Sequence, residues 1–163
     1  MWSVVSSPVG DLRVVAGEVR RSVAITAIEF EPWSSGSGRP LGDRADAHPV
    51  LVAARTQLAS YFAGDLTAFD LPLAPAGTDF QRRVWDQLLL IGYGDTASYG
   101  QIAHRLGKTN TAARAVGLAN GRNPIPIVIP CHRVIGADGS LTGFAGGVQR
   151  KQTLLELEQD ALF

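Results

Sequence analysis

The sequence contains a single cysteine, Cys131, among 163 residues, and this scarcity excludes several kinds of structure. One cysteine cannot form a disulfide within the chain, so we expect a protein of a reducing, cytoplasmic compartment. Only three histidines accompany this thiol, and none has the paired spacing that zinc sites use. We therefore expect no bound metal.

Long hydrophobic runs and an overall charge are also absent. No stretch of eighteen or more apolar residues occurs, and the first residues lack the basic-then-apolar pattern of a secretory signal, so we expect no membrane partner. The formal net charge is zero. Residues 78–152 nevertheless carry nine basic against four acidic side chains, an excess of five positive charges. Such a segment weakly indicates a polyanionic partner and fits an ordinary solvated face equally well.

The first half of the chain has the patterns of a small α/β structure. Apolar runs at 2–5, 12–16 and 23–30 predict three strands, and the spacing of apolar residues over 50–62 predicts a helix. The Ser-, Gly- and Pro-rich residues 32–49 predict a loop without chemistry of its own. We expect a structural domain over 1–70, a linker over 71–78 and a second domain over 79–163.

The second half begins with strong helix signals. Thr78–Gln81 and Ser98–Gln101 have the capping-box pattern and each predict the start of a helix. The second of these helices is short and stops at Gly107, and a further helix is expected over 109–120. Two short helices around a Gly-containing turn are typical of a helix-turn-helix motif, although helix pairs are also common in protein cores.

The single cysteine follows the segment 123–130, in which prolines alternate with isoleucines. The prolines favour an extended segment that is not a central strand, and the alternating isoleucines predict one buried side. A free cysteine is most often a packed small hydrophobe. Here His132 and Arg133 adjoin Cys131 and favour the thiolate, the nucleophilic form. A turn or a bridging water is needed to bring His132 to the thiol, because neighbours on an extended backbone point apart.

The motif Pro130-Cys131-His132-Arg133-Val134 resembles the active-site signature of the O6-alkylguanine-DNA alkyltransferases, the methylated-DNA–protein-cysteine S-methyltransferases. The resemblance extends from about 80 to 158 and includes Ser98-Tyr99, the run 113–117 and Asn123. It implies a small α/β N-terminal domain (an antiparallel sheet plus a helix) before a mainly α C-terminal domain with a winged helix-turn-helix-like DNA-binding motif.

The resemblance also implies an activity. Proteins of this family carry out direct DNA repair by stoichiometric, irreversible transfer of the alkyl group from O6-alkylguanine to their own cysteine, after flipping the damaged base. They act on double-stranded DNA through the minor groove and use no cofactor. We expect a monomer here. The range of alkyl groups, activity on O4-alkylthymine and cooperative binding to DNA stay open.

Five catalytic residues follow from the resemblance. Cys131 is the acceptor, His132 is its base through a water, and Glu158 orients the histidine, although an acid on a terminal helix is most often solvated. Tyr99 donates to the departing guanine, and Asn123 braces the active-site turn. For Tyr99 and Asn123 the ordinary alternatives are a core aromatic and a turn residue.

The DNA contacts implied by the resemblance centre on a helix of small residues around Arg114, which is expected to fill the gap left by the flipped base. Tight packing against a neighbouring helix is the alternative reading of the small residues. The further DNA contacts carried over are Thr109, Asn110, Ala113, Ala115, Gly117, Asn120 and Arg133. The expected substrate pocket consists of Pro130, Val134, Phe144, Ala145 and Gly146. Because Phe144 and Ala145 replace a tyrosine and a serine of some relatives, the base contacts there are expected from the backbone.

Two other functions remain open from the sequence. A cysteine hydrolase could use Cys131 and His132, but Cys–His hydrolases place these residues far apart in sequence. A damage-binding module that flips bases without chemistry is the second alternative, and the presence of the cysteine argues against it.

Overall fold

The computed structural model describes residues 1–33, 41–142 and 144–160. The chain divides into two compact units, Met1–Pro75 and Ala76–Phe163. The two units are described separately below. Part of the loop expected over 32–49 lies outside the described residues, and so does Gly143.

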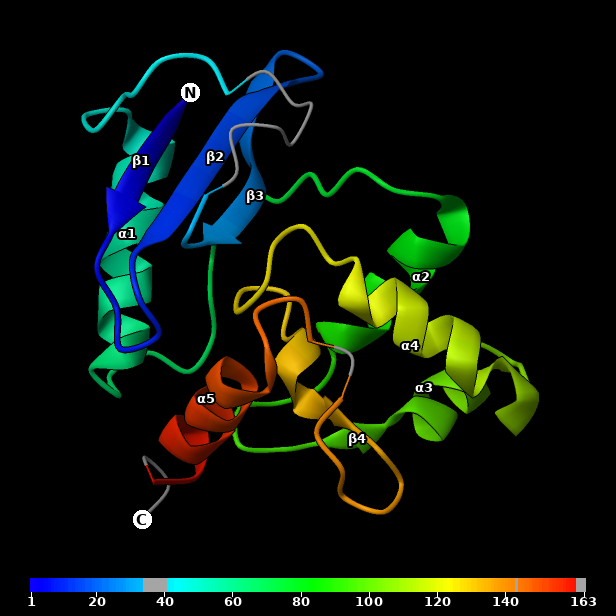
Figure 1. Ribbon diagram of the computed structural model, residues 1–163. Helices are drawn as coiled ribbons and strands as arrows, with labels where there is room; N and C mark the ends of the chain where they lie inside the picture. Colours follow the sequence, from blue (N-terminus) through cyan, green and yellow to red (C-terminus); the bar gives the residue numbers. More distant parts are fainter. Residues whose placement is uncertain (34–40, 143, 161–163) are drawn as a thin grey trace. The chain divides into compact units, whose positions relative to one another are not determined.

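The first unit is a three-stranded antiparallel sheet with one helix. Strands β1 (Trp2–Val5), β2 (Leu12–Val19) and β3 (Ser22–Phe30) pair in the order β1-β2-β3. Helix α1 (Pro49–Phe62) packs on this sheet (Figure 1). Its buried residues, Leu51, Ala54, Leu58 and Tyr61, are the face that the sequence pattern predicted. The expected α/β character of this half is confirmed.

Residues 72–74 are bound to the sheet of the first unit. The amide of Ile25 donates to the Pro72 carbonyl at 2.8 Å, and the amide of Ala74 donates to the Ile25 carbonyl at 2.9 Å. Three of the eight residues expected to form a linker are therefore fixed to β3. The division into domains over 1–70 and 79–163 stays a prediction.

The second unit is mostly helical. It contains α2 (Asp79–Leu88), α3 (Tyr99–Arg105), α4 (Ala113–Gly121) and α5 (Val148–Asp160). Two short strands, β4 (Ala97–Ser98) and β5 (Val134–Ile135), form a parallel pair. Parallel pairing brings the start of α3 next to the segment that follows the cysteine.

Both capping boxes form, because each threonine or serine accepts from the third amide of its helix while the glutamine closes the reciprocal bond. The third helix begins differently from the prediction. A 3-10 turn, η1 (Asn110–Ala112), precedes α4, and the Thr109 side chain makes no capping hydrogen bond. Helices α3 and α4 pack against each other around the turn at Gly107, which has a positive φ of 74°. The helix-turn-helix arrangement is thereby formed.

The core of the second unit surrounds Trp85, which the periodicity of α2 did not mark. Its indole donates to the Ala119 carbonyl at 2.9 Å, so it joins α2 to α4. Val84, Leu88 and Ile91 are buried, whereas Phe80 is only half-buried. Among the described residues, none of the helices has the length and apolarity required to cross a lipid bilayer.

Candidate active site

The segment before the cysteine is compact and, apart from the half-buried Pro124, buried, which corrects the expectation of an extended segment with one buried side. Ile127 has a positive φ of 74°, and the Val128 amide donates to the Pro126 carbonyl at 2.9 Å, so residues 126–128 form a tight turn. A β-branched residue is strained in this region, and such strain persists only where the surroundings enforce it. The prolines fix their own φ, but they do not prevent this reversal of the chain.

Asn123 enforces that reversal. Its side-chain amide donates to the Ile129 carbonyl at 2.8 Å, and its carbonyl oxygen accepts from the Ile125 amide at 3.0 Å. One side chain therefore joins both ends of the turn. The arrangement agrees with the bracing role expected of Asn123. Asn120 adds a further hydrogen bond, to the Cys131 carbonyl at 3.2 Å.

Cys131 begins a 3-10 turn, η2 (Cys131–Arg133), entered through Pro130 with φ −80° and ψ 64°. The turn that is needed to bring His132 to the thiol is therefore present. The thiol is buried, and burial raises the pKa of Cys131 to about 11, although a hydrogen bond from Asn123 and the charge of Lys151 act in the opposite direction. The expectation of a thiol with a lowered pKa is wrong for the free protein. Desolvation outweighs the nearby positive charges.

His132 and Arg133 converge on Glu158 of α5 from the same turn. His132 Nε2 lies 2.7 Å from Glu158 Oε2, and the Arg133 guanidinium donates to both carboxylate oxygens at 2.8 and 3.0 Å. Burial opposes ionisation of Glu158, but the hydrogen bonds and charges of His132 and Arg133 bring its pKa to about 2. Burial lowers the pKa of His132 despite the carboxylate, so the imidazole is neutral at neutral pH. Its buried Nδ1 has no partner among the described residues.

Lys151 is a residue of this site that the sequence did not reveal. Its side chain is fully buried on α5, and its Nζ donates to the Val134 carbonyl at 2.5 Å and to the Thr142 carbonyl at 2.8 Å. It also lies 5.9 Å from the ring centre of Tyr99. The buried face of α5 consists of Lys151, Leu154 and Glu158. Because charged residues usually mark the solvated face of a helix, the periodicity gave no signal for this face.

Tyr99 is half-buried at the start of α3, and its hydroxyl donates to the Thr142 carbonyl at 2.6 Å. Burial raises the pKa of Tyr99, so the phenol keeps its proton. The ring borders a mainly apolar hollow of about 380 Å³, whose other lining residues are Ala113, Arg114, Gly117, Leu118 and Thr142. The expected proton donor and the expected DNA-binding arginine thus line one hollow.

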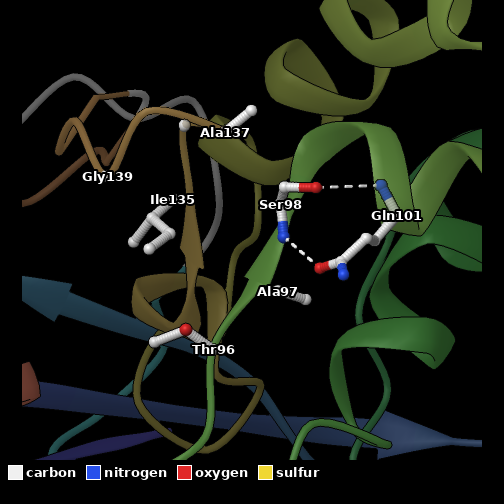
Figure 2. A pocket seen from close by; sticks show the side chains of 8 residues that line it. Thr96, Ala97, Ser98, Gln101, Ile135, Ala137 and Gly139 are labelled. Atoms are coloured by element: carbon white, nitrogen blue, oxygen red, sulfur yellow. Dashed lines mark hydrogen bonds between the residues drawn. The ribbon is translucent and has the colours of Figure 1, made fainter.

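A second hollow, of about 340 Å³, lies beside β4 and β5 (Figure 2). Figure 2 shows the Ser98–Gln101 capping box on one side and Ile135, Ala137 and Gly139 on the other. None of the residues that surround Cys131 lines this hollow. It is therefore not part of the site built around the thiol.

The residues expected to contact DNA fall into two groups. Arg114, Thr109, Asn110 and Ala115 are exposed. Ala113 and Gly117 are half-buried and line the hollow. Asn120 and Arg133 are buried, which corrects their assignment as DNA contacts. The guanidinium of Arg133 donates hydrogen bonds to Glu158 and, at 2.6 Å, to the Ile91 carbonyl, so it does not face solvent.

The residues of the expected substrate pocket are also divided. Pro130 and Val134 are buried beside the thiol, while Phe144 and Gly146 are half-buried and Ala145 is exposed. Across the described parts of the chain, no group of three or more His, Cys, Asp or Glu side chains could hold a metal ion. The expectation of no bound metal stays a prediction.

Comparisons with known proteins place both halves of the chain in one family. The family model of the 6-O-methylguanine DNA methyltransferase DNA-binding domain matches residues 79–160. That of the 6-O-methylguanine DNA methyltransferase ribonuclease-like domain matches residues 1–75. Together the two models cover nearly the whole chain.

Individual relatives agree. The methylated-DNA–protein-cysteine methyltransferase of Mycobacterium tuberculosis is 48% identical over 163 residues, covering 97% of this chain and 92% of that protein. The Methanosarcina barkeri protein of the same name is 59% identical over 161 residues, covering 99% and 98%. The crystal structure of the M. tuberculosis O6-methylguanine methyltransferase superposes with a TM-score of 0.86 at 47% identity, and its DNA complex with 0.87, each covering 98% of this chain and 93% of that one.

Proposed function

The chain belongs to the 6-O-methylguanine DNA methyltransferase family, and we propose that it repairs double-stranded DNA by transferring the alkyl group of O6-alkylguanine to its own Cys131. The observation that carries this assignment is the buried arrangement of Cys131, His132 and Glu158 within a helix-turn-helix unit. The chemistry follows from the positions of these side chains.

The transfer is a displacement at the alkyl carbon. The Cys131 sulfur forms a bond to this carbon, the bond from carbon to O6 breaks, and the electron pair of that bond leaves with the guanine. Because the pKa of the buried thiol is about 11, the thiolate has to be generated at the moment of reaction. A general base contributes about 10²–10⁴ in rate to such a step.

His132 supplies that base. Its Nε2 is held by Glu158, which leaves the buried Nδ1 to accept the thiol proton through a water. Glu158 stays ionised because its pKa is about 2, so it stabilises the imidazolium that forms. Arg133 neutralises the carboxylate in the resting protein and fixes its orientation.

The base has to leave the DNA stack before its O6 atom can reach the thiol, at a cost of a few kcal/mol. The exposed Arg114 on α4 fills the gap and offsets part of that cost. The hollow lined by Tyr99, Arg114 and Leu118 is the entrance for the flipped nucleotide. The Tyr99 hydroxyl leaves the Thr142 carbonyl and donates its hydrogen bond to the departing guanine.

The protein acts once. Alkylation converts the thiolate into a thioether, which has no ionisable proton and is a poor leaving group. Thiol–disulfide exchange does not cleave a thioether, and the chain has no second cysteine. The single free cysteine also fits the reducing, cytoplasmic compartment that we assign to the protein.

The test is a titration of limiting protein against excess duplex that contains O6-methylguanine. We expect a burst of at most one product per protein molecule and a mass gain of one methyl group on the peptide with Cys131. The Cys131→Ala variant should bind the duplex within a few-fold of wild type and give no product. Steady product formation beyond the burst would instead indicate a hydrolase or another enzyme that turns over, and binding without a mass gain would indicate a damage-binding module.

A further inference from the structure

The mechanism above leaves one buried charge without a role. Lys151 is fully buried, and the two acceptors of its Nζ are the backbone carbonyls of Val134 and Thr142. Within the part of the chain that the structure describes, no carboxylate forms an ion pair with it. A buried ammonium without a carboxylate is costly, so a fold retains it at the expense of stability.

The charges around the thiol show where this ammonium acts. Arg133 and Glu158 neutralise each other, and burial keeps His132 neutral. In the resting site Lys151 is therefore the charge without a counter-ion. When the thiol proton moves to His132, Glu158 stabilises the imidazolium and Lys151 is the cation left to pair with the thiolate. Burial raises the pKa of the thiol to about 11 and lowers the pKa of Lys151 to about 8, and the attraction between the ammonium and the thiolate opposes both shifts.

The hydrogen bonds of Lys151 lead to the same place. Val134 is the residue that closes the turn beginning at Cys131, since its amide donates to the Cys131 carbonyl. Thr142 is the residue whose carbonyl also receives the Tyr99 hydroxyl. The ammonium of Lys151 thus binds the backbone that follows Cys131. It also binds the Thr142 carbonyl, which accepts the hydrogen bond of Tyr99, the expected proton donor. It can satisfy the Thr142 carbonyl when the Tyr99 hydroxyl turns to the substrate.

We propose that Lys151 is a positioning residue of the alkyl transfer, whose buried ammonium is the counter-charge of the Cys131 thiolate. Its part in repair rests on the proposed function, whereas its effect on the thiol can be measured without DNA. The other titratable groups around the pair are His132 and Arg133 on η2, Glu158 on α5, Tyr99 on α3 and Tyr93.

The experiment measures the ionisation of Cys131 directly. Because Cys131 is the single cysteine, alkylation by iodoacetamide followed by intact-mass measurement reports this thiol alone. The rate is recorded from about pH 6 to 8 for wild type, Lys151→Met, Lys151→Gln and Lys151→Arg. In this range Lys151, whose pKa is about 8, carries its charge, and the rate of the buried thiol, whose pKa is about 11, rises about tenfold per pH unit, so a shift of the midpoint displaces the whole curve. Lys108→Met is the matched control, because Lys108 is the other lysine of the chain and is exposed.

We expect the midpoint of the pH profile to rise by about 1 unit or more in Lys151→Met and Lys151→Gln, since a nearby opposite charge shifts a pKa by about that amount. Lys151→Arg, which keeps the charge, should have a midpoint at or below that of wild type, and Lys108→Met should equal wild type. If Lys151 only bound the two carbonyls, its replacement would change the melting temperature but not the midpoint of the pH profile.

Equal midpoints in wild type and a folded neutral variant overturn the proposal. If neither neutral variant folds, as judged by circular dichroism, an upward shift in Lys151→Arg overturns it. The duplex titration separates this outcome from the proposed function. Failure of wild type to accept a methyl group from DNA would refute the repair activity. A shifted midpoint in the neutral variants would still support the role of Lys151.

Discussion

Each of the two compact units contains an arginine–glutamate ion pair, and the two pairs have different surroundings. In the first unit Arg13 Nε lies 3.0 Å from Glu29, whose side chain is 27% exposed. In the second unit Arg133 Nε lies 2.8 Å from Glu158, whose side chain is 1% exposed. Glu29 can be hydrated, whereas Glu158 depends on its protein partners.

The partners differ as well. Arg13 lies over the rings of Trp2 and Trp33, at 6.0 and 5.2 Å from their centres, so its surroundings are largely aromatic. Glu158 shares its carboxylate between Arg133 and His132. An ion pair that water can reach contributes little to folding, and a sealed pair is costly to break. The comparison supports a structural role for the first pair and agrees with the role in holding His132 that we propose for Glu158 of the second.

The largest effect should come from Glu158→Gln. The substitution leaves Arg133 buried without its carboxylate, and breaking a buried pair costs about 3–5 kcal/mol. It also removes the group that holds His132, so the burst rate should fall by about 10²-fold or more. Urea unfolding and single-turnover kinetics measure the two losses.

Glu29→Gln is the matched control, because it makes the same change in the pair of the first unit, whose glutamate is partly exposed. We expect its burst rate to equal that of wild type. If Glu29→Gln slowed transfer as much as Glu158→Gln, the assignment of the two pairs to different roles would be wrong.

The buried pair of the second unit should also make the stability of the protein sensitive to acid. The pKa of Glu158 is about 2 in the folded protein, below its ordinary value of 4.5. Its contribution to the free energy of unfolding is therefore complete above about pH 4.5 and is lost as the pH falls towards 2. Burial also lowers the pKa of His132, so stability already decreases below the ordinary histidine pKa near 6.5. Unfolding in urea from pH 8 to 3 should show a steeper acid loss in wild type than in Glu158→Gln, and parallel curves would contradict this.

A third arginine sharpens the comparison because it is exposed. Arg114→Ala should leave the melting temperature unchanged but slow repair of the duplex by about 10–100-fold, in line with a flipping cost of a few kcal/mol. Transfer from free O6-benzylguanine, which requires no flipping, should be unaffected. Arg122→Ala is the control, since Arg122 is also exposed and caps the same helix. Equal losses on both substrates would refute the role of Arg114 in flipping.

The features predictable from the sequence were those determined by residues close together in the chain. The capping boxes at Thr78 and Ser98 and the buried face of α1 depend on side chains within one or a few turns. The family signature around Cys131 predicted catalytic roles for Cys131 and His132, which stay predictions, and it gave no indication of their electrostatics. The burial of Lys151 and the low pKa of Glu158 arise from partners 9 to 26 residues away, which a local pattern does not contain. The turn at Ile127 was missed because local propensity disfavours its positive φ.

The smallest effect should come from Arg13→Met, which removes the buried arginine from the first pair, whose glutamate is partly exposed. Methionine can still pack between Trp2 and Trp33, and water can solvate the released Glu29, so no buried charge is left unpaired. The loss should be about 1 kcal/mol, the sum of a weak ion pair and the contact of a cation with aromatic rings. Arg133→Met is the matched variant, and it should lose about 3–5 kcal/mol because Glu158 then remains buried. Equal losses in the two variants, measured by urea unfolding at pH 7, would show that the burial of the glutamate does not distinguish the pairs.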